Sequence, residues 1–174
     1  MADPDPNARI YTGKDGGGRF FVDYCNWARI PEYREFIFNS NAAAIGAELM
    51  ESNQVQLFHE HVLVKEAAAG VPTPWHQDAP YYCVDSAKTV SLWVPLDEVP
   101  RETAPEFISG SHKWDKFYRP QRFDGSALNE HDGLEDIPNI NGNREDYDIL
   151  GWAVGPGDAV AFDYRTIHGA PANA

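Results

Sequence analysis

Two histidines and one aspartate are the residues of this chain whose types and spacing could hold a metal ion. His76 and Asp78 stand one residue apart, and on an extended strand such residues project to the same face. His168 follows much later in the chain. Two imidazoles and one carboxylate on one side of an iron(II) ion leave three neighbouring coordination positions open, so that iron can bind a co-substrate and dioxygen together. The pattern predicts a non-haem iron site of the kind used by oxygenases.

The specificity of this prediction comes from the flanking sequence, because a bare His-x-Asp pattern occurs easily by chance. Four blocks stand in a fixed order: residues 73–82 (TPWHQDAPYY), 90–97 (VSLWVPLD), 107–112 (FISGSH) and 155–169 (GPGDAVAFDYRTIHG). From about Val55 to the C-terminus, this order resembles the phytanoyl-CoA dioxygenase family of iron(II)- and 2-oxoglutarate-dependent oxygenases.

The resemblance implies a fold, a ligand set and a co-substrate pocket. The implied fold is mainly β, a double-stranded β-helix (a cupin-like jelly roll) with flanking helices. His76, Asp78 and His168 stand where the family has its iron ligands. Gln77 and Trp93 match positions that line the 2-oxoglutarate pocket in the family, and Lys65 is a further candidate for a co-substrate carboxylate. The implied cofactors are Fe(II), 2-oxoglutarate and dioxygen.

One position departs from the family pattern. Family members carry an arginine after the distal histidine, where its planar guanidinium pairs with the far carboxylate of 2-oxoglutarate. The residues after His168 are GAPANA, and Arg165 precedes the histidine. We therefore expect a chain truncated after Ala174, with an incomplete barrel; the alternative is a real loss of the arginine that impairs co-substrate binding.

Length and composition agree with a single soluble domain, and the expected partner of the implied oxygenase is a small-molecule substrate. With 174 residues and 43% hydrophobic content, the chain can bury the core of one domain. The net charge of −13 argues against nucleic acid as a partner and weakly against a polyanionic coenzyme A thioester. No apolar run is long enough to span a membrane, and the acidic, proline-containing start does not resemble a signal peptide, so the expected location is cytoplasmic.

Cys25 and Cys83 are expected to be reduced and at least partly buried, and no feature specifies an oligomeric state.

Local patterning places these residues on strands and loops. Residues 1–18 are rich in Pro, Gly and Asp and predict a flexible segment, followed by a single oxygenase domain over 19–174. Residues 113–149 fit neither helix nor strand and predict a lid-like, substrate-facing insertion, with disorder as the alternative. The predicted elements are a strand over 19–27, helices over 31–38 and 41–51 with Ser40 as the cap, strands over 54–65 and 89–96, and a hairpin of 150–154 and 159–163 around the turn 155–158.

Three functional hypotheses follow. The first is a hydroxylase that inserts oxygen into an unactivated carbon of a small organic substrate; Asp78 favours it over a related halogenase, which has a small residue at that position. The second is a non-catalytic or impaired metal-binding jelly roll without the 2-oxoglutarate arginine. A third, a jelly-roll metal hydrolase, is less favoured because no general base stands beside the ligands. Tyr81, Tyr82 and Trp93 are either core aromatics or walls of a substrate pocket.

Overall fold

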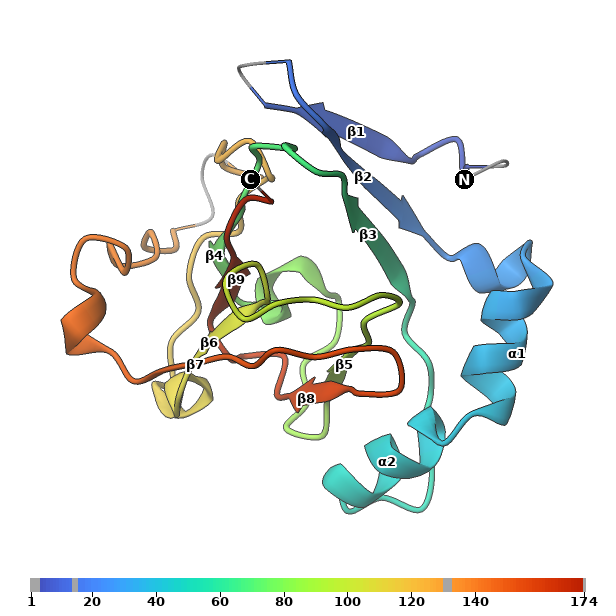
Figure 1. The fold of residues 1–174 in the computed structure, drawn as a ribbon. Helices are drawn as coiled ribbons and strands as arrows, with labels where there is room; N and C mark the ends of the chain where they lie inside the picture. The colour runs from blue at the N-terminus through green and yellow to red at the C-terminus, as the bar shows by residue number, and fades with distance from the viewer. Residues whose placement is uncertain (1–3, 14–15, 130–132, 174) are drawn as a thin grey trace. The chain divides into compact units, whose positions relative to one another are not determined.

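The computed structural model describes residues 4–13, 16–129 and 133–173. Antiparallel sheets dominate, and two α-helices accompany them, as the resemblance implies (Figure 1). Backbone contacts group the chain into two compact units. The first contains residues up to Val71 together with Asn173, and the second is Pro72–Ala172. No helix in the described ranges is both long and apolar enough to cross a membrane.

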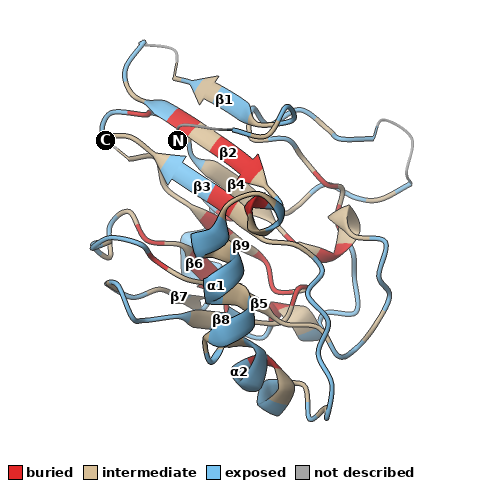
Figure 2. Cartoon of the chain, turned by 90° about the vertical axis from the view of Figure 1, so that its right-hand side faces the viewer, coloured by how far each residue is buried: buried red, intermediate tan, exposed pale blue. Residues whose placement is uncertain are grey.

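The first unit is built on a three-stranded sheet in the order β1-β2-β3, made of Arg9–Thr12, Arg19–Tyr24 and His61–Lys65. The central strand carries its core, since Phe20 and Val22 are fully buried (Figure 2). β1 lies inside the segment 1–18, where the sequence predicted no strand.

The strand predicted over 54–65 is wrong in its first half, because β3 begins only at His61. The physical reason is the length of its partner. Tyr24 is the last residue of β2 and pairs with His61, so no further β2 residues remain to extend the ladder. β2 itself ends there because Cys25 takes a left-handed conformation with φ of 53° and leads into a short 3₁₀ turn.

Both predicted helices form, within one or two residues of the expected bounds. They are α1, Pro31–Asn39, and α2, Ala42–Leu49. Proline opens α1, where its missing N–H costs nothing. The predicted cap Ser40 is wrong by one residue, because the residue at the N-cap of α2 is Asn41, whose side chain makes no capping hydrogen bond. The hydroxyl of Ser40 accepts a hydrogen bond from the backbone N–H of Ala42 at 3.2 Å.

The second unit contains two antiparallel sheets. The four-stranded sheet has the order β4-β9-β6-β7, and the two-stranded sheet pairs β5 with β8. Their bounds are Thr73–His76 (β4), Ser91–Trp93 (β5), Glu106–Ile108 (β6), Ile149–Leu150 (β7), Val160–Phe162 (β8) and His168–Ala170 (β9). The sheets meet where the rings of Phe107 on β6 and Phe162 on β8 lie 4.9 Å apart. Successive strands of this unit lie in different sheets, as in a jelly roll, except that β6 pairs with β7. The pairing found among the described strands does not close a barrel.

The prediction that 150–154 and 159–163 pair as a hairpin is wrong. The turn exists, because Asp158 donates its backbone N–H to the carbonyl of Gly155 at 3.0 Å. However, β7 before the turn pairs with β6, whereas β8 after it pairs with β5. The flanking strands bond to different sheets because each has a partner strand elsewhere in the chain, and the pairing with β5 brings Phe162 against Phe107.

The segment 113–149 contributes to the core of the second unit. Tyr118 and Ile140 are buried in one cluster with Ile108 and Ile167. Its other residues line two surface hollows of about 330 and 750 Å³, the first beside Arg165 and the second beside Trp75. Tyr118 and Ile140 therefore anchor the predicted lid to the core. The role of this segment toward a substrate stays a prediction. Residues 130–132 of this segment lie outside the described residues.

Both cysteines are free, as predicted, but the expectation that they are partly buried is wrong. Cys25 and Cys83 are exposed, because Cys25 occupies the turn after β2 and Cys83 follows the short 3₁₀ turn Ala79–Tyr81, outside the strands that build the cores.

Candidate metal centre

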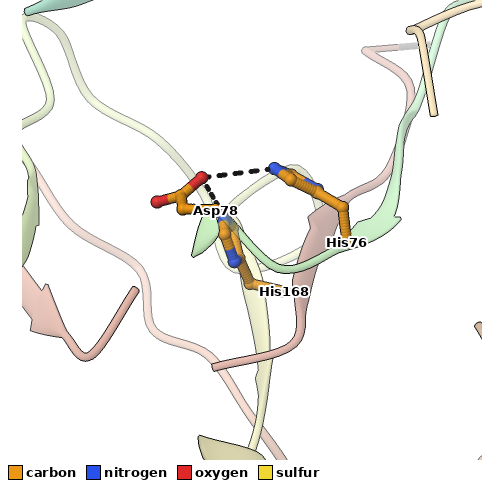
Figure 3. Close-up of side chains that lie close together, drawn as sticks. All are labelled: His76, Asp78 and His168. Atoms are coloured by element: carbon orange, nitrogen blue, oxygen red, sulfur yellow. Dashed lines mark ion pairs between the residues drawn. The ribbon is translucent and has the colours of Figure 1, made fainter. Parts of the chain in front are cut away.

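His76, Asp78 and His168 come together in the second unit (Figure 3). Each offers one ligand atom, and these atoms all lie within 4.8 Å of one another. The strand register brings the two histidines together, because His76 at the end of β4 is paired with His168 at the start of β9. Directly opposed residues of an antiparallel pair project to the same face, and Asp78 follows two residues after His76. Among the residues that the structure describes, this is the group of histidine, cysteine and acidic side chains arranged to hold an ion.

The two imidazoles are oriented in the same way. Nδ1 of His76 lies 2.8 Å from the carbonyl oxygen of Pro74, and Nδ1 of His168 lies 3.0 Å from that of Thr166. Since a carbonyl only accepts hydrogen bonds, each Nδ1 carries a proton, which leaves Nε2 as the nitrogen that can coordinate a metal. Such backbone contacts are the usual way in which a protein orients a metal-binding histidine.

Both Nε2 atoms face the same carboxylate oxygen. Oδ1 of Asp78 lies 3.7 Å from Nε2 of His76 and 3.8 Å from Nε2 of His168. These three atoms lie close enough together for one ion to contact all of them. The donor set therefore fits a divalent metal ion, and two imidazoles with one carboxylate suit iron(II).

Burial keeps His76 ready to bind a metal. Removal of its ring from water, together with repulsion by His168, lowers the pKa of His76 to about 4, although Asp78 acts in the opposite direction. The ring is therefore neutral at pH 7, which is the form that coordinates metals. Aromatic rings surround the pair: Tyr81 meets His76 edge-on at 5.8 Å, and Phe162 lies 4.6 Å from His168.

Sequence reasoning missed one member of this site, Ser91. Its hydroxyl donates a hydrogen bond of 2.7 Å to Oδ2 of Asp78, the oxygen that does not face the histidines. Ser91 lies on β5, two residues before Trp93, so both side chains project to one face of that strand. The signal was present in this alternation, because Trp93 was already a candidate on that face.

The predicted co-substrate residues lie in three different surroundings. Gln77 is buried, and its amide is bonded to backbone: Nε2 donates to the carbonyls of Lys116 at 3.0 Å and Arg165 at 2.8 Å, and Oε1 accepts from the N–H of Tyr118 at 3.1 Å. Trp93 is partly buried on β5. Lys65 belongs to the first unit, where burial lowers its pKa to about 8 and its ammonium lies 5.0 Å from the ring centre of Phe20.

Comparison with known proteins decides the family. The model of the phytanoyl-CoA dioxygenase (PhyH) family matches residues 19–174. This chain belongs to the phytanoyl-CoA dioxygenase family. The resemblance seen in the four sequence blocks is thereby confirmed. A search of functionally curated proteins found no significant match.

Solved structures of similar fold include non-heme α-ketoglutarate dependent enzymes of nogalamycin biosynthesis. The non-heme α-ketoglutarate dependent epimerase SnoN from nogalamycin biosynthesis is 25% identical with a TM-score of 0.72, and the match covers 97% of this chain and 62% of SnoN. The carbocyclase SnoK from the same biosynthesis is 18% identical, with a TM-score of 0.68 and coverage of 96% and 62%. EvdO2 from Micromonospora carbonacea var. aurantiaca, complexed with 2-oxoglutarate, is 19% identical, with a TM-score of 0.66 and coverage of 93% and 69%. This PhyH-family chain thus spans a little over three fifths of the length of SnoN and SnoK.

Proposed function

We propose that this PhyH-family protein is an iron(II)- and 2-oxoglutarate-dependent oxygenase of a small organic substrate. The observation that carries the proposal is the convergence of His76, Asp78 and His168, with both Nε2 atoms directed at one carboxylate oxygen. A structure of SnoN contains Fe³⁺ and α-ketoglutarate, and that of EvdO2 contains 2-oxoglutarate, which supports the same cofactors here. When bound, iron with 2-oxoglutarate and dioxygen supplies an oxidation that is coupled to decarboxylation of 2-oxoglutarate to succinate.

The residues of the chain hold and shield this chemistry. His76 and His168 supply imidazoles whose Nδ1 atoms are bonded to backbone carbonyls, so the rings are oriented before a metal binds. Asp78 contributes one negative charge through Oδ1. Tyr81 packs against the ring of His76 and Phe162 against that of His168, and apolar neighbours of this kind strengthen electrostatic contacts within a site.

Hydroxylation of an unactivated carbon is the finer proposal. The carboxylate of Asp78 supports oxygen transfer over halogenation, because it occupies the position that a halide would otherwise take. SnoN and SnoK carry the names epimerase and carbocyclase, so this fold also serves other outcomes of the same oxidation. The second candidate, carried over from the sequence analysis, is a metal-binding module without turnover.

We assign Trp93 to the 2-oxoglutarate pocket, following its match to the family pattern, whereas Lys65 stays a candidate that the sequence alone offers for a co-substrate carboxylate. Gln77 contributes differently in our proposal: it stands between two ligands, and its three backbone hydrogen bonds hold that loop against two other segments. Its replacement would leave buried carbonyl and N–H groups without partners, so it is a positioning residue for His76 and Asp78.

The test is succinate formation coupled to oxygen uptake, measured with iron(II), 2-oxoglutarate and a panel of small organic substrates. The protein should form succinate, and Asp78→Ala should reduce the rate by at least a hundredfold, because one ligand and its charge are lost. Lys65→Ala should raise the 2-oxoglutarate requirement about tenfold, since a charge-assisted hydrogen bond contributes about 1.5–3 kcal/mol, while iron binding stays unchanged. Product analysis separates hydroxylation from epimerisation and cyclisation.

Two results would count against this function. Near-normal turnover in Asp78→Ala would remove the triad from the chemistry. Tight iron binding by the unaltered protein with no succinate above the metal-free background, across the panel, would favour the metal-binding module.

A further inference from the structure

The two carboxylate oxygens of Asp78 have different partners. Oδ1 faces both imidazole nitrogens at 3.7 and 3.8 Å, whereas Oδ2 accepts the hydroxyl hydrogen of Ser91 at 2.7 Å. The first oxygen is thus available to a metal ion, and the second is already engaged by the protein.

This difference decides how many coordination positions the carboxylate can occupy. A carboxylate binds a metal through one oxygen or through both. A site that must bind 2-oxoglutarate through two atoms and dioxygen through one needs three open positions, and a two-oxygen contact from Asp78 would close one of them. The Ser91 hydroxyl opposes that contact because it holds Oδ2 by a charge-assisted hydrogen bond.

The position of Ser91 is fixed by strand pairing. It lies on β5, where it is the register partner of Phe162 on β8. Phe162 in turn packs its ring 4.6 Å from that of His168. One pair of opposed residues in the two-stranded sheet therefore contacts two of the three ligands, Asp78 and His168.

We propose that Ser91 is a positioning residue that restricts Asp78 to one-oxygen coordination and so keeps three metal positions open. This inference rests on the proposed function, because it assigns the metal to the triad. It adds that Ser91, which is not a ligand, determines how many coordination positions of the metal stay open.

The experiment compares the isosteric pair Ser91→Thr and Ser91→Val, with Ser91→Ala as a third variant. Threonine keeps the hydroxyl, and valine replaces it with a methyl group of similar size. Thr89→Val is the matched control, because the buried Thr89 hydroxyl has no hydrogen-bond partner among the described residues. Each protein is loaded with Mn²⁺, the metal-bound waters are counted by magnetic resonance in ¹⁷O-enriched water, and 2-oxoglutarate is titrated without oxygen.

We expect the loss of the Ser91 hydroxyl to weaken 2-oxoglutarate binding much more than Mn²⁺ binding. Ser91→Val and Ser91→Ala should bind Mn²⁺ with at most a tenfold change, carry one bound water fewer, and bind 2-oxoglutarate ten- to a hundredfold more weakly, the usual range for losing a group that orients a ligand. Ser91→Thr and Thr89→Val should match the unaltered protein. Thermal unfolding of the metal-free variants checks that each one is folded.

Other outcomes overturn the inference in distinguishable ways. An unchanged water count and unchanged 2-oxoglutarate binding in Ser91→Val and Ser91→Ala would show that Ser91 has no such role while the proposed function stands. If Ser91→Val and Ser91→Ala fail to fold, Ser91→Thr must still reproduce the unaltered water count, and a changed count would refute the role. Failure of the unaltered protein to bind Mn²⁺ at all would overturn both the inference and the proposed function.

Discussion

Each imidazole of the triad is oriented by the carbonyl two residues before it, which is a local arrangement that strand backbone makes readily available. Pro74 serves His76, and Thr166 serves His168. Because backbone carbonyls make these contacts, a side-chain substitution at Pro74 or Thr166 would not by itself remove the acceptor. Histidine orientation therefore depends on the path of the chain, whereas the orientation of Asp78 depends on one side chain, Ser91.

The lowered pKa of His76 has a consequence for the stability of the metal-free protein. The ring binds a proton with a pKa of about 4 when folded and about 6.5 when unfolded, so between these values the unfolded chain holds more protons. Stability contributed by the neutral ring is fully present above about pH 6.5 and is lost as the pH falls toward 4. We expect the free energy of unfolding to fall by about 2 kcal/mol from this residue between pH 7 and pH 5.

Urea unfolding in the presence of a chelator measures this effect. His76→Asn, which cannot titrate, should lose less stability than the unaltered protein over the same pH interval. Equal pH dependence in the two proteins would mean that His76 is not held neutral by its surroundings.

At the scale of elements, the contact between β4 and β9 sets the distance between the histidines. Gly169 follows His168, and a Cβ atom there would lie 3.0 Å from the carbonyl oxygen of Thr73 and 3.3 Å from the Cα of Trp75. A methyl group at this point must push β9 away from β4. We expect Gly169→Ala to destabilise the protein by about 1–3 kcal/mol and also to weaken Mn²⁺ binding, because His168 moves with the strand.

Gly157→Ala is the matched control for that prediction. Gly157 has a φ of 102° in the turn before β8, and a Cβ there meets nothing within 4 Å. Alanine should cost about 1–2 kcal/mol through backbone strain alone, with metal affinity unchanged. Titration calorimetry with Mn²⁺ and thermal unfolding separate the two effects; normal Mn²⁺ affinity in a folded Gly169→Ala protein would show that the strand contact does not set the ligand spacing.

At the scale of the whole molecule, the net charge of −13 sets the response to salt. Self-repulsion among like charges destabilises a compact chain, and the Debye length falls from about 30 Å at 0.01 M salt to about 8 Å at 0.15 M. Exposed ion pairs such as Arg19–Glu66 would weaken with salt, but such pairs contribute little. We therefore expect the melting temperature to rise by a few degrees over this range of sodium chloride, measured by calorimetry; a fall would show that attractive pairs outweigh the repulsion.

The sequence by itself determined the family, the mainly β class, both helices and the three candidate ligands. These depend on local features: the one-residue spacing of His76 and Asp78, the motifs around them, and the proline that opens α1. Tertiary structure alone decided which strands pair. It set the start of β3 by the length of β2 and assigned β7 and β8 to different sheets. It also revealed Ser91, because that serine meets Asp78 only when β5 lies beside the segment that follows β4, and hydrogen bonds between distant segments leave no periodic pattern in the chain.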